Sequence, residues 1–155
     1  MRVFRLIKAR YSPALLSGEG GLLAEGRWHS VGRRIVYAAS CEALTVLEVR
    51  VHLGRSLPGA GERYAMHVID LPDSAVEVLP LERYPDDWRH QPPRPASQAI
   101  GDAWLEAHRS LALRVPSVHS HSDATLLLNP AHAAAAQLEV LETRPYQFDP
   151  RLFAA

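Results

Sequence analysis

The sequence predicts an α+β protein built from short strands and two substantial helices. Short apolar segments bounded by turn residues recur along the chain, and only two longer segments show helical spacing. Strands and helices do not alternate regularly, as they would in a doubly wound parallel sheet. The length of 155 residues and the hydrophobic fraction of 47% fit a single globular domain over residues 1–155.

The strand-like segments are spread over the whole chain. We expect strands at residues 3–6, 34–39, 64–71, 75–79, 113–118, 125–128 and 138–141. Pro116 cannot donate a backbone hydrogen bond, which places it at an edge or a bulge. Five prolines between residues 80 and 96 predict a loop, and residues 131–137 have room for one or two helical turns.

Two segments carry apolar residues at spacings of three and four. The first helix is expected over residues 41–53, with Ser40 as its N-cap and Gly54 ending it. The second is expected to begin with Ser97 as its N-cap and to run to about residue 111. These are the only substantial helices that the sequence predicts.

Composition excludes several classes of protein. Seventeen basic and 17 acidic residues give no net charge, which disfavours direct nucleic-acid binding through an overall basic surface. The single cysteine, Cys41, can form neither an internal disulfide nor a cysteine-based zinc site. No apolar run is long enough to span a membrane, and the N-terminus lacks the apolar core of a signal peptide. We therefore expect a cytoplasmic protein that does not bind membranes.

The charge is nevertheless unevenly distributed. Residues 1–60 contain nine basic and four acidic residues, and all but one of the 17 basic residues are arginine. Arginine suits bidentate contacts with phosphate oxygens, so the cationic first part can indicate a small anionic ligand. Codon bias alone can also produce an arginine-rich surface.

Gly26-Arg27-Trp28 is the first candidate for binding an anion. A glycine beside an arginine can bring backbone amides and a guanidinium to a phosphate, although no phosphate-binding P-loop motif is present. The alternative is an exposed turn with Trp28 packed underneath. Tyr37, inside an apolar run, is either a core residue with a hydrogen-bonded hydroxyl or a flat face for a heteroaromatic ring.

Glu48 stands in the middle of an apolar helical segment. A carboxylate there is costly unless it is solvated or has a partner. It can face water and pair with His52 one turn later, or the two side chains can point into a cleft. Both interpretations remain open.

Ser117 follows Pro116 near the end of an expected strand, where its hydroxyl can reach a ligand. It lacks the Gly-x-Ser-x-Gly setting of a hydrolase nucleophile. His119, His121 and His132 form no recognised metal-binding pattern, and we interpret them as solvated loop residues. We therefore expect no metal.

Taken together, these segments resemble the RES domain family from about Val3 to Phe153. The match in order and spacing rests on Phe4-Arg5-Leu6, Leu16-Ser17-Gly18-Glu19-Gly20-Gly21, Gly26-Arg27-Trp28, Gly32, Val36-Tyr37-Ala38, Leu47-Glu48, His52, Gly101-Asp102-Ala103-Trp104, Leu113-Arg114-Val115-Pro116-Ser117 and Leu127-Leu128-Asn129-Pro130-Ala131-His132. The family is named for an Arg, a Glu and a Ser, and Arg27, Glu48 and Ser117 stand at those places.

The sequence departs from the family pattern at three positions. His29 stands where asparagine is common, Thr125 where asparagine often precedes the Leu-Leu-Asn-Pro motif, and Ala133 where proline is frequent. The first change can alter contacts near a ligand, and the others concern loop geometry. None removes the named Arg, Glu or Ser.

The resemblance implies a fold, an activity and a partner. The fold would be similar to that of ADP-ribosyltransferases, with a mixed, mostly antiparallel sheet. The protein would be the toxin of a type II toxin–antitoxin module, paired with an Xre-type antitoxin. Its substrate would be NAD+, cleaved between nicotinamide and ribose with phosphate or water as acceptor. The alternative is transfer of ADP-ribose to a host protein, such as an enzyme of nucleotide synthesis.

These expectations give each candidate residue a role. Glu48 would stabilise positive charge on the ribose, and Arg27 would hold the diphosphate. Tyr37 and Trp28 would contact the nucleotide, with Tyr37 stacking on nicotinamide, and Ser117 would donate a hydrogen bond nearby. His52 would position the carboxylate or a ribose hydroxyl.

Two other classes of function compete with NAD+ cleavage. A toxin ribonuclease would use histidines as acid and base, but the chain shows no basic stripe for RNA. A non-catalytic nucleotide-binding module would bind NAD+ without turning it over. Intact RNA would eliminate the first, and release of nicotinamide would eliminate the second.

Overall fold

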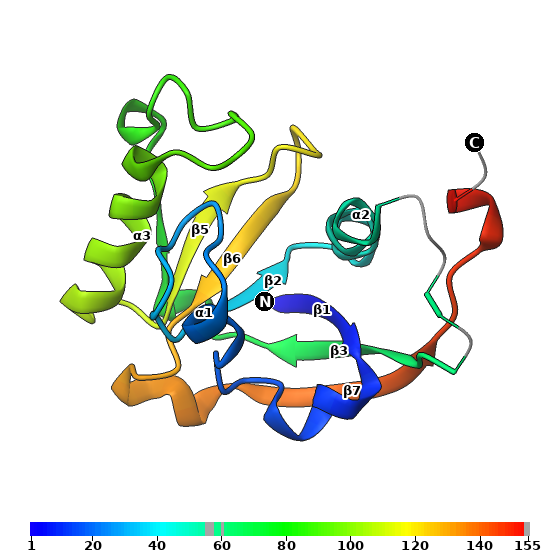
Figure 1. Ribbon diagram of the computed structural model, residues 1–155. Coiled ribbons are helices and arrows are strands. Elements are labelled where there is room, and N and C mark those ends of the chain that lie inside the picture. The colour runs from blue at the N-terminus through cyan, green and yellow to red at the C-terminus, as the bar shows by residue number, and fades with distance from the viewer. Residues whose placement is uncertain (55–57, 60, 154–155) are drawn as a thin grey trace.

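A seven-stranded sheet organises the computed structural model, which describes residues 1–54, 58–59 and 61–153 (Figure 1). The strand order is β4-β5-β6-β2-β1-β3-β7. The strands are β1 (Arg2–Lys8), β2 (Val36–Ala39), β3 (Tyr64–Asp70), β4 (Val76–Val78), β5 (Ala112–Pro116), β6 (Ala124–Leu128) and β7 (Glu139–Tyr146). All neighbours are antiparallel except β4 and β5, which are parallel. The predicted α+β class with a mixed, mostly antiparallel sheet is confirmed.

The described residues form three α-helices and five short 3-10 helices. The α-helices are α1 (Gly20–Leu23), α2 (Glu42–Leu53) and α3 (Pro95–Ala107). The 3-10 helices are Ala9–Ala14, Asp73–Ala75, Leu81–Arg83, Ala133–Gln137 and Pro150–Phe153. In Figure 1, α3 lies beside the β5–β6 half of the sheet and α2 lies near β1 and β2. None of the helices described is long and apolar enough to cross a membrane.

The N-cap of α2 differs from the prediction. Cys41 is the cap, and its sulfur accepts a hydrogen bond from the Leu44 amide at 3.4 Å. Ser40 instead uses its hydroxyl oxygen to accept the amide of Ala124 at 2.9 Å, which ties β2 to the start of β6. The helix ends at Gly54 as predicted, with a positive φ of 64°.

The boundaries of α3 also differ from the prediction. The helix begins at Pro95, because proline is favoured at the first helical position, where its missing amide costs nothing. Ser97 therefore lies inside the first turn, with its hydroxyl donating to the carbonyl of Arg94. The helix ends at Ala107, where His108 adopts a left-handed conformation. Leu111 is not helical and is fully buried in the sheet core.

Other elements follow the prediction with shifted ends. Pro116 ends β5, beyond the residues from Ala112 to Arg114 that pair with β4. The last strand continues to Tyr146 rather than ending at 141. Its exposed edge position explains the difference, because an edge strand needs no apolar run.

The sheet is buried on both faces along β6. Leu126 and Leu128 belong to one core cluster and Leu127 to another, as expected for successive strand residues that point to opposite faces. Trp104 of α3 packs in the cluster of Leu127. On α2, the Thr45 hydroxyl donates to the Phe4 carbonyl of β1 at 2.9 Å. Both helices are thus fixed to the sheet.

Gly101 lets α3 approach the segment that contains Arg27. A Cβ at this position would lie 1.7 Å from the Trp28 carbonyl oxygen, which no real contact allows. Glycine is therefore required here by packing, although it costs about 1 kcal/mol relative to alanine in an ordinary helix.

We predict that Gly101→Ala lowers the free energy of unfolding by about 1–3 kcal/mol, because backbone must move to admit the methyl group. Urea unfolding measures the change. The control is Gly20→Ala, since a Cβ there meets nothing within 4 Å; it should change stability by no more than about 0.5 kcal/mol. Equal stability of Gly101→Ala and the unsubstituted protein would contradict this account of the packing.

Candidate functional site

Glu48 of α2 is held by the segment that follows β5. The hydroxyl of Ser117 donates to Glu48 Oε1 at 3.1 Å, and Ser117 itself is only 2% exposed. The His119 amide donates to the Ser117 oxygen at 3.0 Å, which fixes the direction of the hydroxyl. A half-buried carboxylate is thus oriented by groups 69 residues away in sequence. Because the Ser117 proton is directed at a carboxylate, Ser117 is arranged as a donor.

Of the two interpretations left open for Glu48 and His52, the pairing of their side chains is not formed. His52 Nδ1 lies 2.7 Å from the backbone carbonyl oxygen of Glu48, and the histidine is exposed. His119 is the imidazole near the carboxylate, with Nε2 at 3.6 Å from Glu48 Oε2. The interpretation of His119 as a solvated loop residue missed this contact, since sequence alone does not show where the β5–β6 loop meets α2.

Arg27 lies against the loop that precedes α3. Its guanidinium donates to the carbonyl oxygens of Trp88 at 2.6 Å and His90 at 2.8 Å, and to Gln91 Oε1 at 3.2 Å. These contacts use three of the five N–H donors of a guanidinium. Burial lowers the pKa of Arg27, while the negative charge of Glu48 opposes this shift.

Tyr37 of β2 belongs to the same neighbourhood. Burial raises the pKa of its hydroxyl well above the ordinary value, and the charges of Arg27 and Glu48 act on this pKa in opposite directions. The hydroxyl accepts a hydrogen bond from the Trp28 amide at 3.2 Å and lies 2.8 Å from His29 Nδ1. The predicted hydrogen-bonded hydroxyl is present, and the predicted stacking on a ligand stays a prediction.

Trp28 lies beneath this site. Trp28 is 1% exposed, and its ring stacks on that of Trp88, with ring centroids 6.1 Å apart. This matches the alternative in which Trp28 packs underneath an exposed turn. The ring of Trp28 is therefore packed in the core and is not presented to a ligand in this structure.

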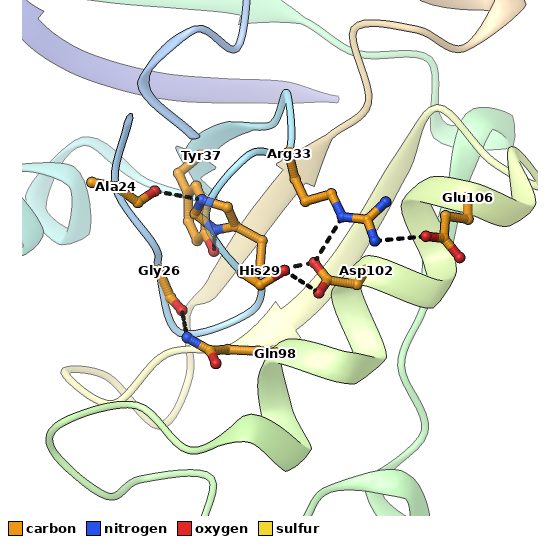
Figure 2. Close-up of polar contacts among 9 residues, drawn as sticks. Ala24, Gly26, His29, Arg33, Tyr37, Gln98, Asp102 and Glu106 are labelled. Carbon is orange, nitrogen blue, oxygen red and sulfur yellow. Dashed lines mark hydrogen bonds and ion pairs between the residues drawn. The ribbon is translucent and has the colours of Figure 1, made fainter. Parts of the chain in front are cut away.

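Hydrogen bonds and an ion pair join the segment from Glu25 to Arg33 to one face of α3 (Figure 2). Gln98 donates to the Gly26 carbonyl at 3.2 Å, and Asp102 accepts from the amide and the hydroxyl of Ser30 at 3.1 and 2.6 Å. Glu106 accepts from Arg33 at 2.6 Å. The three residues of α3, spaced by four, share a helix face, so their spacing was a signal that sequence reasoning did not use.

Arg5 adds a second cation beneath Tyr37. Its guanidinium donates to the Tyr37 carbonyl at 2.7 Å, and its buried Nε has no hydrogen-bond partner among the described residues. Burial lowers the pKa of Arg5 to about 10. The sequence singles out Arg5 only as part of the Phe4-Arg5-Leu6 motif.

Ser117 also lines a groove of about 410 Å³ between the loop before α3 and the β5–β6 loop. Its lining includes Tyr84, Trp88, Arg89, Arg114 and His121. Within the described ranges, no three His, Cys, Asp or Glu side chains gather as metal ligands. Of the six residues predicted for the site, Ser117 lines this groove, whereas Arg27, Trp28, Tyr37, Glu48 and His52 do not. What the structure brings together is one oriented carboxylate, that of Glu48, with the hydroxyl of Ser117 and the imidazole of His119.

The chain is similar to known proteins over almost its full length. A family model described as the RES domain matches residues 2–149. The protein named "Toxin Res" from Photorhabdus laumondii is 35% identical over 130 residues, covering 84% of this chain and 82% of that protein. A protein from Sphingobium named "Prs ADP-ribosylating toxin" is 38% identical over 141 residues, covering 88% and 86%.

The fold has also been seen before. The crystal structure of the M. tuberculosis MbcT–MbcA toxin–antitoxin complex contains a chain with a TM-score of 0.78 to this one, at 23% identity. The similarity covers 98% of this chain and 86% of that chain. With a family match from residue 2 to residue 149, the chain that carries Arg27, Glu48 and Ser117 belongs to the RES domain family.

Proposed function

We propose that the protein is the toxin of a toxin–antitoxin module and that it cleaves the nicotinamide–ribose bond of NAD+, with phosphate or water as acceptor. The observation that carries the proposal is the Glu48 carboxylate, which accepts the Ser117 hydroxyl at 3.1 Å. Family membership and the toxin names of the relatives support the same conclusion.

The chemistry requires stabilisation of a positive charge. When the bond between C1′ of the ribose and the nicotinamide nitrogen breaks, its electron pair leaves with the nitrogen, and nicotinamide departs as a neutral base. The ribose then has oxocarbenium character until an oxygen of phosphate or water bonds to C1′. A fixed carboxylate beside the sugar stabilises this charge without reorganising. Glu48 takes this role.

The other side chains bind and orient the dinucleotide. The remaining donors of Arg27 bind the diphosphate, and the Tyr37 ring stacks on nicotinamide. Ser117 holds Glu48 in one orientation, so it is a positioning residue. His52 contacts the carbonyl of Glu48 instead of its carboxylate and has no assigned step.

The second candidate is transfer of ADP-ribose to a host protein. It breaks the same bond and differs only in the acceptor. The similarity to a protein named "Prs ADP-ribosylating toxin" favours this alternative. An antitoxin is the proposed partner in either case, because the similar solved fold comes from a toxin–antitoxin complex; an Xre-type antitoxin remains the expectation.

We predict that Glu48→Gln lowers the rate of nicotinamide release from NAD+ by at least about 100-fold, the usual loss when one electrostatic contact to a transition state is removed. Glutamine keeps the shape and can still accept a hydrogen bond from Ser117, so folding is preserved. Chromatography of nicotinamide, with and without phosphate, measures the rate.

The control is Glu139→Gln on the exposed edge strand β7, which should leave the rate unchanged. Growth of cells that express each variant gives a second measurement, in which Glu48→Gln and Arg27→Ala should relieve growth arrest. A Glu48→Gln enzyme with unreduced turnover would refute the assigned role.

We also predict the fate of the ADP-ribose group. NAD+ labelled in its adenosine part, added with the protein to a bacterial lysate, should give label in small molecules, with more ADP-ribose 1″-phosphate when phosphate is present. Label bound covalently to a protein would establish the alternative acceptor. The Glu48→Gln protein should produce neither.

A further inference from the structure

His29 is buried directly behind Tyr37. The residue is 4% exposed, and its ring lies 5.4 Å from the Tyr37 ring, centroid to centroid. A Cβ on Gly26 would come within 2.7 Å of both His29 Nδ1 and the Tyr37 hydroxyl oxygen. The glycine of the Gly-Arg-Trp motif is therefore needed for this contact to form.

The hydrogen bonds fix one tautomer of His29. Nε2 lies 3.1 Å from the carbonyl oxygen of Ala24, which can only accept, so Nε2 carries a proton (Figure 2). In a neutral imidazole, Nδ1 is then unprotonated and accepts the proton of the Tyr37 hydroxyl at 2.8 Å. The Tyr37 oxygen in turn accepts from the Trp28 amide. The chain of bonds from Trp28 to Ala24 is complete when His29 is neutral.

This arrangement leaves Tyr37 without a proton to give. Its only hydroxyl proton points at His29, and one of its lone pairs is used by Trp28. Burial also keeps the phenol neutral, because it raises the pKa of Tyr37. The part of Tyr37 left for a ligand is its ring face, whose orientation is set by His29.

We propose that His29 is a positioning residue for Tyr37: the neutral imidazole accepts the tyrosine proton and fixes the ring for stacking, and protonation of His29 disables the site. The inference deepens the proposed function and rests on it for its kinetic readout. It names a group that acts through Tyr37 and does not touch the substrate.

Protonation of His29 places a second N–H against the Tyr37 hydroxyl. The phenol must then turn its proton away from Nδ1 and find another acceptor in a buried setting, which costs free energy. Burial lowers the pKa of His29 from its ordinary value of 6.5, so the imidazole is neutral at neutral pH.

Charged groups around His29 oppose this shift. Three groups favour the charged form of the His29 imidazole: the carbonyl of Ala24, the carboxylate of Asp102 on α3, and the carboxylate of Glu25 in the segment before His29. Asp102 is itself bonded to Ser30 and lies 3.9 Å from Arg33 Nε. Desolvation outweighs them. Because the pKa in the folded protein is below 6.5, activity should be constant above that pH and fall below it.

The test is the pH dependence of kcat/KM for nicotinamide release. In the unsubstituted protein, the rate should fall tenfold per pH unit once His29 protonates. His29→Asn keeps an oxygen that can accept the Tyr37 proton and cannot titrate. It should retain activity at neutral pH and lose this acid limb. His29→Ala should be roughly tenfold less active at all pH values, because the Tyr37 hydroxyl loses its acceptor.

The matched control is His108→Asn, at the exposed left-handed end of α3, where asparagine is well tolerated. It should keep the profile of the unsubstituted protein. An acid limb in His29→Asn that coincides with that of the unsubstituted protein would overturn the inference.

Nitrogen-15 NMR of the histidines gives a readout independent of catalysis. The His29 ring should show a proton on Nε2 and a bare Nδ1 at neutral pH, and a protonated Nδ1 in the neutral ring would overturn the inference. If no variant releases nicotinamide, the proposed function fails, whereas the tautomer and its loss on acidification still test the role of His29.

Discussion

The candidate site depends on one constraint. The carboxylate of Glu48 must be held in a fixed position, although it projects from the middle of α2, a helix with mostly apolar neighbours. A half-buried carboxylate needs a hydrogen-bond donor, and the donor must approach from outside the helix. Ser117 meets this need because β5 ends at Pro116, so that the next residue faces α2. The bond from Thr45 to β1 fixes the helix on the sheet at the same time. The position of the carboxylate therefore depends on two strands, β5 and β1, that come from distant parts of the sequence.

The remaining parts of the site depend on close approaches that only glycine allows. Gly101 admits the carbonyl of Trp28 against α3, and Gly26 admits the contact between His29 and Tyr37. Residues of α3 spaced by four then bind the segment that carries Arg27. Arg27 is thus positioned from two sides, by this segment and by the carbonyls of the loop before α3. These two glycines and the polar face of α3 formed by Gln98, Asp102 and Glu106 explain why a short Gly-Arg-Trp motif suffices to place a guanidinium.

Sequence reasoning predicted the α+β class, both long helices and most strands, because apolar periodicity and turn residues are local signals. It missed the extent of β7, whose polar residues suit an exposed edge. It also misplaced the N-caps of α2 and α3, where Cys41 and Arg94 stand in place of the expected serines. At the site, family motifs singled out Arg27, Glu48 and Ser117. The burial of Trp28 matches the alternative that the sequence left open, whereas the contact of His119 with Glu48 arises from tertiary packing, which no spacing in the sequence encodes.

The most direct measurement is a crystal structure of the Glu48→Gln protein with NAD+ bound, since this substitution should allow the dinucleotide to persist. The account predicts that the nicotinamide ring lies against Tyr37, that a ribose hydroxyl contacts residue 48, and that the diphosphate contacts Arg27. A dinucleotide bound elsewhere, or a sugar out of reach of residue 48, would contradict the central claim that this carboxylate faces the ribose as its bond to nicotinamide breaks.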